Sequence, residues 1–317
     1  MQQPTRKLGL ALSGAAARSV FYVGFLEVLQ EQGVRVDVIS AQSGASIVAA
    51  AYACGTLDRL KKEMFALDWG KLRGLAVRSK RGGLFSLSRA EEYLRAHITK
   101  SAHFENLQTR LVFGATNLHT GRVVSLAMGD IAHAICTTCS VPGLFEPIQW
   151  GNQSLVDGGV LSVLPAQLAR EAGATTVLGV SVRSTKHVFL PSHIKLRRAY
   201  NVVKQMVLTS TPARMIRAVK RVVSPDGMVG FFESVPHDEF RADFTLLRAV
   251  TRSLDLAIDV TKTESLSNDA YLCDYMIHEG NGNYGDSVKI SQTERLYQDG
   301  RQSALYHLDA IKKLVAE

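Results

Sequence analysis

Apolar residues in the first fifty positions follow two alternating spacings. Residues 7–13 and 36–42 are short apolar runs of the kind found in buried strands. Residues 18–32 and 45–53 instead place apolar or small side chains at helical intervals. A strand, a tight turn and a helix, followed by the same three elements again, predict the start of a parallel sheet that helices cover on both faces.

The same alternation continues along most of the chain. Further strand patterns occur at residues 111–115, 154–157, 176–182 and 271–278. Further helical patterns occur at residues 88–98, 130–138, 165–172 and 293–316. We therefore expect one domain spanning residues 1–317, with a three-layer α/β/α fold around a mostly parallel central sheet.

The alternation breaks between residues 187 and 243. Two basic segments with helical apolar spacing, 194–208 and 213–223, are separated by Pro212. We expect an insertion at 187–243 that forms a basic helical lid or a membrane-contact segment. Cationic amphipathic helices suit peripheral contact with an anionic membrane, here through 194–223, and an ordinary pair of surface helices is an equal alternative.

The composition is that of a globular protein with a basic surface. Of 317 residues, 46% are hydrophobic, which is enough for a sizeable core. Lys and Arg number 37 against 29 Asp and Glu, and the net charge of +8 favours anionic partners. No aromatic platform or nucleic-acid motif accompanies this charge, so we expect no nucleic-acid partner. The absence of a signal-peptide pattern and of an apolar run near ~18 residues predicts a cytoplasmic protein, membrane-associated at most peripherally.

A serine stands at the turn between the second predicted strand and its helix. The turn reads Ala41-Gln42-Ser43-Gly44-Ala45, with small residues two places to either side of the serine. A nucleophile elbow has this form, because bulky neighbours would collide with adjacent backbone. The helix that follows favours negative charge near the hydroxyl. Taken alone, the turn fits a serine that only caps the helix equally well.

A loop of very small residues follows the first predicted strand. It reads Gly14-Ala15-Ala16-Ala17-Arg18 and leads into a helix. Backbone N–H groups in such a loop can approach a phosphate or the oxyanion of an acyl-transfer reaction. The loop lacks both the G-x-G-x-x-G pattern and the lysine of a P-loop, which disfavours a nucleotide site. Close packing of the helix on the sheet is the alternative explanation.

An aspartate ends the predicted strand at 154–157. Asp157 is followed by Gly158 and Gly159. At the same sheet edge as Ser43, its carboxylate could accept the serine proton, for which burial should raise its pKa above about 3.9. An Asp-Gly-Gly sequence alone is more often a turn. The three motifs together, in this order and each at a strand end, are far more specific than any one of them.

These motifs resemble those of the patatin-like phospholipases, in particular the bacterial branch similar to the neuropathy target esterase catalytic domain. The family's G-G-G-x-R-G loop corresponds to residues 14–19, its G-x-S-x-G elbow to 41–45 and its D-G-G/A motif to 157–159. Less central stretches also resemble the family, at residues 81–84, 115–121, 139–145 and 284–286. The resemblance covers most of the chain outside 187–243.

The resemblance implies a patatin-like fold and a serine lipid acyl-hydrolase of the phospholipase A or lysophospholipase type. It implies a Ser-Asp dyad, in which Ser43 attacks the ester carbonyl and Asp157 activates the serine and then water. Neither a histidine, a metal nor an organic cofactor is required. The oxyanion hole would come from the loop at residues 14–18, and Arg18 would orient that loop or meet a phosphate. An acyltransferase that uses the same dyad, and a non-catalytic lipid-binding or regulatory protein, remain alternatives.

Several glycines of the family pattern are replaced in this chain. The substituted positions are Ala15, Ala16, Ser19, Ala41 and Ala45. Alanine still provides a backbone N–H, but at a position with φ above zero it costs about 1–2 kcal/mol. We therefore expect strain in this region and an altered substrate or a low rate.

Two further groups of residues could carry chemistry. Cys136 and Cys139 form a C-x-x-C pair without the further ligands that a zinc site needs, so we expect two buried thiols one helical turn apart. His119 and His133 lie nearest to the motifs and would serve in a Ser-His-Asp site if no dyad exists.

Overall fold

The computed structural model describes residues 6–67, 74–75, 77–79, 82–182, 269–279 and 292–316. The predicted insertion at 187–243, its basic segment 194–223 and the stretch 284–286 lie outside the described residues. In the part of the chain that is described, no helix combines the length and the apolar character that a membrane span needs.

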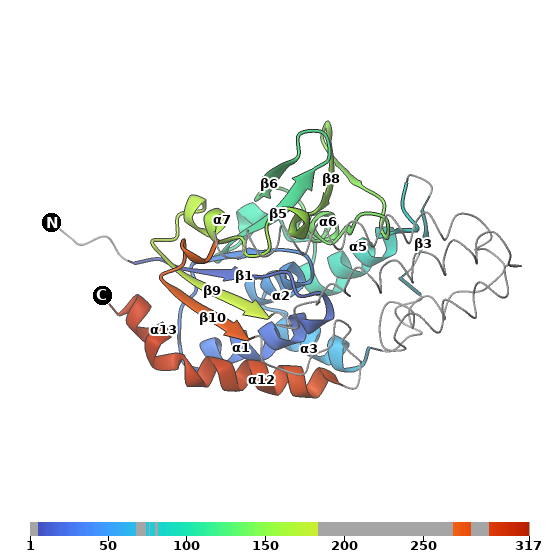
Figure 1. Cartoon of the computed structure of the whole chain (residues 1–317). Helices are drawn as coiled ribbons and strands as arrows, with labels where there is room; N and C mark the ends of the chain where they lie inside the picture. Colours follow the sequence, from blue (N-terminus) through green and yellow to red (C-terminus); the bar gives the residue numbers. More distant parts are fainter. Residues whose placement is uncertain are drawn as a thin grey trace, which may run out of the picture.

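The described strands include one eight-stranded mixed sheet (Figure 1). Its parallel part runs in the order β10 (Tyr275–Glu279), β9 (Thr176–Val182), β1 (Leu8–Leu12), β2 (Val38–Ala41) and β5 (Arg110–Asn117). Its antiparallel part comprises β6 (Arg122–Leu126), β7 (Ile148–Trp150) and β8 (Gln153–Asp157). A separate pair of short strands consists of β3 (Val77–Arg78) and β4 (Phe85–Ser86).

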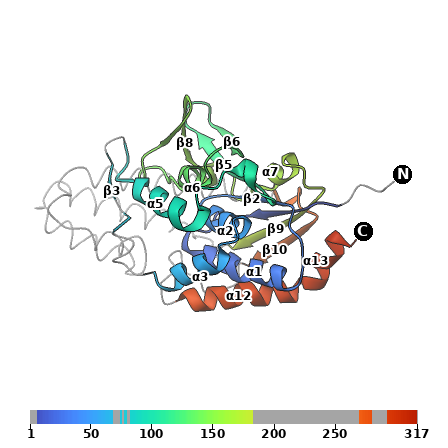
Figure 2. The ribbon, with the colours of Figure 1, turned by 180° about the vertical axis from the view of Figure 1, so that it is seen from behind.

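Helices cover both faces of this sheet (Figures 1 and 2). The larger core cluster joins the sheet to α1 (Val20–Glu31), α2 (Gly44–Ala53), α3 (Leu57–Phe65), α6 (Ile131–Thr138), α12 (Thr293–Tyr306) and α13 (Leu308–Val315). A smaller cluster joins the other face to α7 (Ala166–Glu171). The remaining helical elements are α5 (Ser88–Leu94), the π-helix η2 (Arg95–Thr99) and the 3-10 turns η1 (Ala16–Ser19), η3 (Phe104–Asn106) and η4 (Gly158–Val160). This arrangement confirms the predicted α/β/α fold with a mostly parallel sheet.

Strands β2 and β8 share one edge of β5. Ala41 of β2 pairs with Phe113 of β5. Asp157 of β8 pairs with Ala115, two positions further along. Because β6 pairs with both of these β5 residues, it occupies the opposite edge. Strand β2 runs parallel to β5 and β8 runs antiparallel to it, so the two strands run toward each other along this edge. Their last residues, Ala41 and Asp157, pair with the β5 residues on either side of Gly114.

The C-terminal helix α12 packs against α1 at a close crossing. A Cβ atom added at Gly300 would lie 2.0 Å from the carbonyl oxygen of Phe21. One added at Gly24 would lie 2.2 Å from the carbonyl oxygen of Tyr297. The crossing therefore requires a glycine on each helix, because backbone atoms occupy the space of both side chains.

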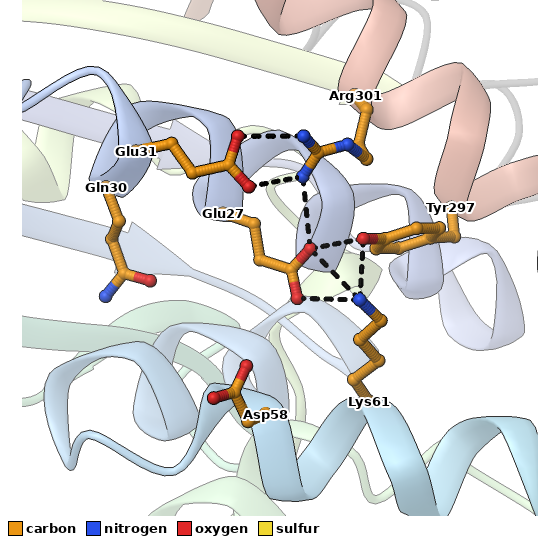
Figure 3. A pocket seen from close by; sticks show the side chains of 7 residues that line it. All are labelled: Glu27, Gln30, Glu31, Asp58, Lys61, Tyr297 and Arg301. Atoms are coloured by element: carbon orange, nitrogen blue, oxygen red, sulfur yellow. Dashed lines mark hydrogen bonds and ion pairs between the residues drawn. The ribbon is translucent and has the colours of Figure 1, made fainter.

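A cluster of charged side chains lies beside the place where α1 and α12 cross (Figure 3). The Glu27 carboxylate accepts a hydrogen bond from the Tyr297 hydroxyl and forms an ion pair with Lys61 at 3.2 Å. Arg301 forms an ion pair with Glu31 at 2.8 Å. These side chains line a pocket of about 450 Å³. The pocket lies near the C-terminal end of α1, whereas the predicted catalytic loop precedes its N-terminal end, so this pocket is not the predicted site.

Candidate active site

Ser43 stands between β2 and α2 in a strained backbone conformation. Its φ is 50° and its ψ is −137° at the N-terminal cap of α2. A non-glycine residue in such a sparsely populated region costs about 1–3 kcal/mol and persists only where its surroundings hold it. The Ser43 N–H donates to Thr138 Oγ1 at 3.1 Å, and the Ser43 carbonyl accepts from Ser46 Oγ at 2.7 Å. The turn has the geometry of a nucleophile elbow.

The neighbours of Ser43 pack without the glycines of the family pattern. Ala41 and Ala45 are fully buried, and neither has a positive φ. The Gln42 side chain is buried against Gly114 of β5. The elbow therefore accepts alanine at both outer positions without backbone strain.

The loop after β1 lies directly against the elbow. A Cβ atom at Gly44 would lie 2.6 Å from the Ala16 carbonyl oxygen and 2.6 Å from Ser19 Oγ. One at Gly14 would lie 3.5 Å from the Cβ of Ser43. The predicted oxyanion loop and the predicted nucleophile are thus in contact, and Gly44 is the glycine of the elbow that this contact requires.

Backbone hydrogen bonds narrow the choice of oxyanion donors. The Gly14 N–H donates to the Val163 carbonyl at 3.1 Å, and the Arg18 N–H donates to the Ala15 carbonyl at 2.9 Å. Within the described ranges, no carbonyl accepts from the N–H groups of residues 15–17. Of the predicted loop at 14–18, the N–H groups of residues 15–17 are therefore the ones that no backbone carbonyl of the described residues takes up.

Tyr22 anchors the start of this loop. Its hydroxyl lies 2.9 Å from the carbonyl oxygen of Ser13 and 3.2 Å from that of Val180. The Ser13 hydroxyl lies 2.9 Å from the same phenolic oxygen. Burial raises the pKa of Tyr22 to about 12. The phenol therefore stays protonated near neutral pH and keeps the loop attached to α1.

Asp157 ends β8 as a buried carboxylate with 5% of its surface exposed. Its N–H donates to the Ser140 carbonyl at 3.0 Å, and its Oδ1 accepts from the Gly159 N–H at 2.7 Å. A Cβ atom at Gly158 would lie 2.3 Å from the Gly114 carbonyl oxygen. Gly158 thus allows the chain after β8 to pass close to β5, and Gly159 donates a hydrogen bond to the Asp157 carboxylate.

The thiol of Cys139 lies beside α2, the helix that follows Ser43. Its sulfur lies 4.0 Å from Ser46 Oγ in the first turn of α2. Burial raises the pKa of Cys139 well above its ordinary value. The Asp157 carboxylate raises this pKa further, whereas hydrogen bonds with Ser46 and Ser43 lower it. Cys139 thus lies beside the first turn of α2, and the charge of Asp157 acts on its thiol.

The two candidate histidines, His119 and His133, make their contacts with residues other than Ser43 and Asp157. Nδ1 of His133 lies 3.1 Å from the Glu91 carboxylate, and its ring stacks on Trp150. The hydrogen bond with Glu91 raises the pKa of His133. His119 lies exposed in the turn between β5 and β6. These positions give no support to a Ser-His-Asp arrangement.

The C-x-x-C sequence is a pair of free thiols. Cys136 lies in α6 and Cys139 is the C-terminal cap of that helix. Burial raises the pKa of Cys136 well above its usual value, as it does for Cys139. Among the residues that the structure describes, no cluster of three or more His, Cys, Asp or Glu side chains could hold a metal ion.

Of the substituted family glycines, Ala16 alone has a positive φ, at 45°. Relief of its strain, about 1–2 kcal/mol, should exceed the extra chain entropy of glycine, about 0.5–1 kcal/mol. Ala16→Gly is therefore expected to raise the free energy of unfolding by about 0.5–1 kcal/mol, measured by urea denaturation. Ala17→Gly, at the next position without a positive φ, is the matched control and should lower it by a similar amount. Equal losses in both variants would contradict a strained Ala16.

Thr138 belongs to the site but carries no recognisable signal in the sequence. Its hydroxyl contacts the elbow from α6, a contact between residues 95 positions apart. The sequence feature that could have drawn attention to Thr138 is its position directly before the stretch at 139–145, which resembles the family.

Comparisons with known proteins match these motifs to one family. The model of the patatin-like phospholipase family matches residues 10–170, just over half of the chain. An uncharacterised NTE family protein of Mycobacterium tuberculosis is 29% identical over 205 residues, which cover 59% of this chain and 32% of that protein. Lysophospholipase NTE1 of Saccharomyces cerevisiae is 27% identical over 187 residues, which cover 56% of this chain and 11% of that protein. The matched region thus spans a third or less of these relatives.

Among solved structures, VipD from Legionella pneumophila aligns with 97% of this chain and 67% of its own. The TM-score is 0.43 and the sequence identity is 13%, values too low to support an inference.

Proposed function

The chain belongs to the patatin-like phospholipase family, and from this premise we propose that it is a serine lipid acyl-hydrolase with Ser43 as nucleophile and Asp157 as base. Its substrates are acyl esters of glycerophospholipids, lysophospholipids or related lipids. The observation that supports the proposal most is the shared edge of β5, where β2 and β8 end beside one another.

In the first half-reaction, Asp157 accepts the hydroxyl proton of Ser43 while Oγ bonds to the ester carbonyl carbon. The carbonyl oxygen becomes negative, and the N–H groups of residues 15–17 together with the N-terminus of α2 stabilise it. Collapse of the tetrahedral intermediate breaks the ester C–O bond. The alcohol leaves with the proton from Asp157, and the acyl group remains on Ser43.

In the second half-reaction, Asp157 accepts a proton from water, and the water oxygen adds to the acyl carbon. The same N–H groups stabilise the second oxyanion. The bond to Ser43 Oγ then breaks, the serine recovers a proton from Asp157 and the fatty acid leaves. An alcohol in place of water would give acyl transfer by the same steps, and its ester product distinguishes that reaction from hydrolysis.

The name of the yeast relative, a lysophospholipase, supports lysophospholipids as the first substrate class to test. The basic surface, with a net charge of +8, supports a phosphate-bearing substrate.

Ser43→Ala tests the proposal directly. Loss of the nucleophile should reduce fatty-acid release from a lysophospholipid by at least about a thousandfold, because the covalent route is closed. Ser125→Ala, at an exposed position of β6, is the control and should retain the parent rate. Equal rates in Ser43→Ala and the parent would overturn the assignment of the nucleophile.

A further inference from the structure

We infer that Thr138 is a positioning residue for Ser43: one buried hydroxyl holds the strained elbow against β5 at the point where β2 and β8 both end. The inference rests on the proposed function, since it names the residue that sets the geometry of the proposed nucleophile and base.

The hydroxyl of Thr138 makes two hydrogen bonds across the site. Oγ1 accepts from the Ser43 N–H at 3.1 Å and donates to the Gly114 carbonyl at 2.6 Å. Thr138 is fully buried, so water does not compete for either bond. Gly114 lies between Phe113, the partner of β2, and Ala115, the partner of β8. A single hydroxyl therefore ties the elbow to the position where the two strands meet.

The two residues after Thr138 contact the same region. The Cys139 thiol lies 4.0 Å from the Ser46 hydroxyl in α2. The Ser140 carbonyl accepts from the Asp157 N–H at 3.0 Å. The end of α6 thus contacts the elbow on one side and the end of β8 on the other. This segment helps to set the separation of nucleophile and base.

The Ser43 backbone needs such support. It lies beyond the end of β2, so no strand pairing takes up its N–H, and Thr138 supplies the acceptor. A positive φ at a serine persists only where the surrounding bonds hold it. Without the hydroxyl, the backbone should relax and carry Oγ away from its reacting position. A displacement on the order of 1 Å can cost about a hundredfold in rate.

Three variants separate positioning from stability. Thr138→Val removes the hydroxyl at nearly constant volume, and Thr138→Ser restores it. Thr137→Val is the matched control, because Thr137 is also fully buried and its hydroxyl donates only to the His133 carbonyl of its own helix, at 2.8 Å. Circular dichroism should first establish that each variant is folded. The measurements are kcat and KM for a lysophospholipid, and the rate at which a fluorophosphonate labels Ser43.

Thr138→Val is expected to lower kcat and the labelling rate by about 10- to 100-fold with little change in KM. Thr138→Ser should recover most of the rate, and Thr137→Val should match the parent. If Thr138→Val matches Thr137→Val in rate, or if Thr138→Ser stays as slow as Thr138→Val, the positioning role is wrong while the proposed function stands. If the folded parent neither hydrolyses the lipid nor reacts with the fluorophosphonate, the proposed function fails and this role fails with it.

Discussion

Asp157→Asn is expected to hydrolyse a lysophospholipid about a thousandfold more slowly than the parent while keeping the parent's fold. An amide cannot accept the proton of Ser43 or of the deacylating water, so both half-reactions lose their base. The fold should survive because Asn retains an oxygen that can accept the Gly159 N–H, as Asp157 Oδ1 does at 2.7 Å. Steady-state kinetics give the rate, and thermal unfolding followed by circular dichroism reports the fold.

Asp58→Asn is the control for this variant. Asp58 is an exposed acidic residue in the first turn of α3, and its neutralisation should leave the rate within about twofold of the parent. A folded Asp157→Asn protein with the parent rate would show that another group acts as the base.

Gly300→Ala is expected to lower the free energy of unfolding by about 2–3 kcal/mol. In an exposed helix interior the same change stabilises by about 1 kcal/mol, so the predicted sign is reversed here. The reason is the Phe21 carbonyl oxygen, 2.0 Å from the position of the added Cβ. Both clashing atoms are fixed to a helix, so relief requires α12 to move away from α1. Urea denaturation of the purified chain measures the loss.

Gln302→Ala serves as the control on the same helix, because Gln302 is exposed. Its unfolding midpoint should stay close to that of the parent. A Gly300→Ala protein as stable as the parent, or more stable, would show that the helices do not approach one another this closely.

The inner strands of the parallel part could be predicted because they are buried on both faces. The apolar runs that predict β1, β2 and β9 need no partner to be recognised, and residues 176–182 agree with the observed β9 at both ends. Strands β6 and β7 are not predicted, because they are short and polar residues interrupt the apolar ones in their sequences, RVVSL and IQW.

Helix ends were harder to predict where no glycine or proline marks them. The helical pattern at residues 293–316 predicts one helix, whereas the chain forms α12 and α13 with a break at His307. Helix α3 was missed because its exposed face is strongly charged and it buries Leu57 and Leu60 alone. The break at His307 and the formation of α3 both depend on packing against other elements.

The motifs identify the candidate catalytic residues, but not the directions of the strands that carry them. The sequence places Asp157 at a strand end but does not give the direction of that strand. Strand β8 runs antiparallel to β5 and ends beside β2 from the opposite direction. Likewise, nothing in the sequence around Thr138 indicates that its hydroxyl contacts Ser43. Strand direction and contacts between distant residues depend on the whole fold, which local patterns do not specify.

Reaction of the folded protein with a fluorophosphonate, followed by peptide mass mapping, tests the central claim most directly. The account predicts one covalent adduct on Ser43, no adduct in Ser43→Ala and slow labelling of Asp157→Asn, since the hydroxyl is activated only beside its carboxylate. An adduct on a different residue, or a folded parent that remains unlabelled, would contradict it.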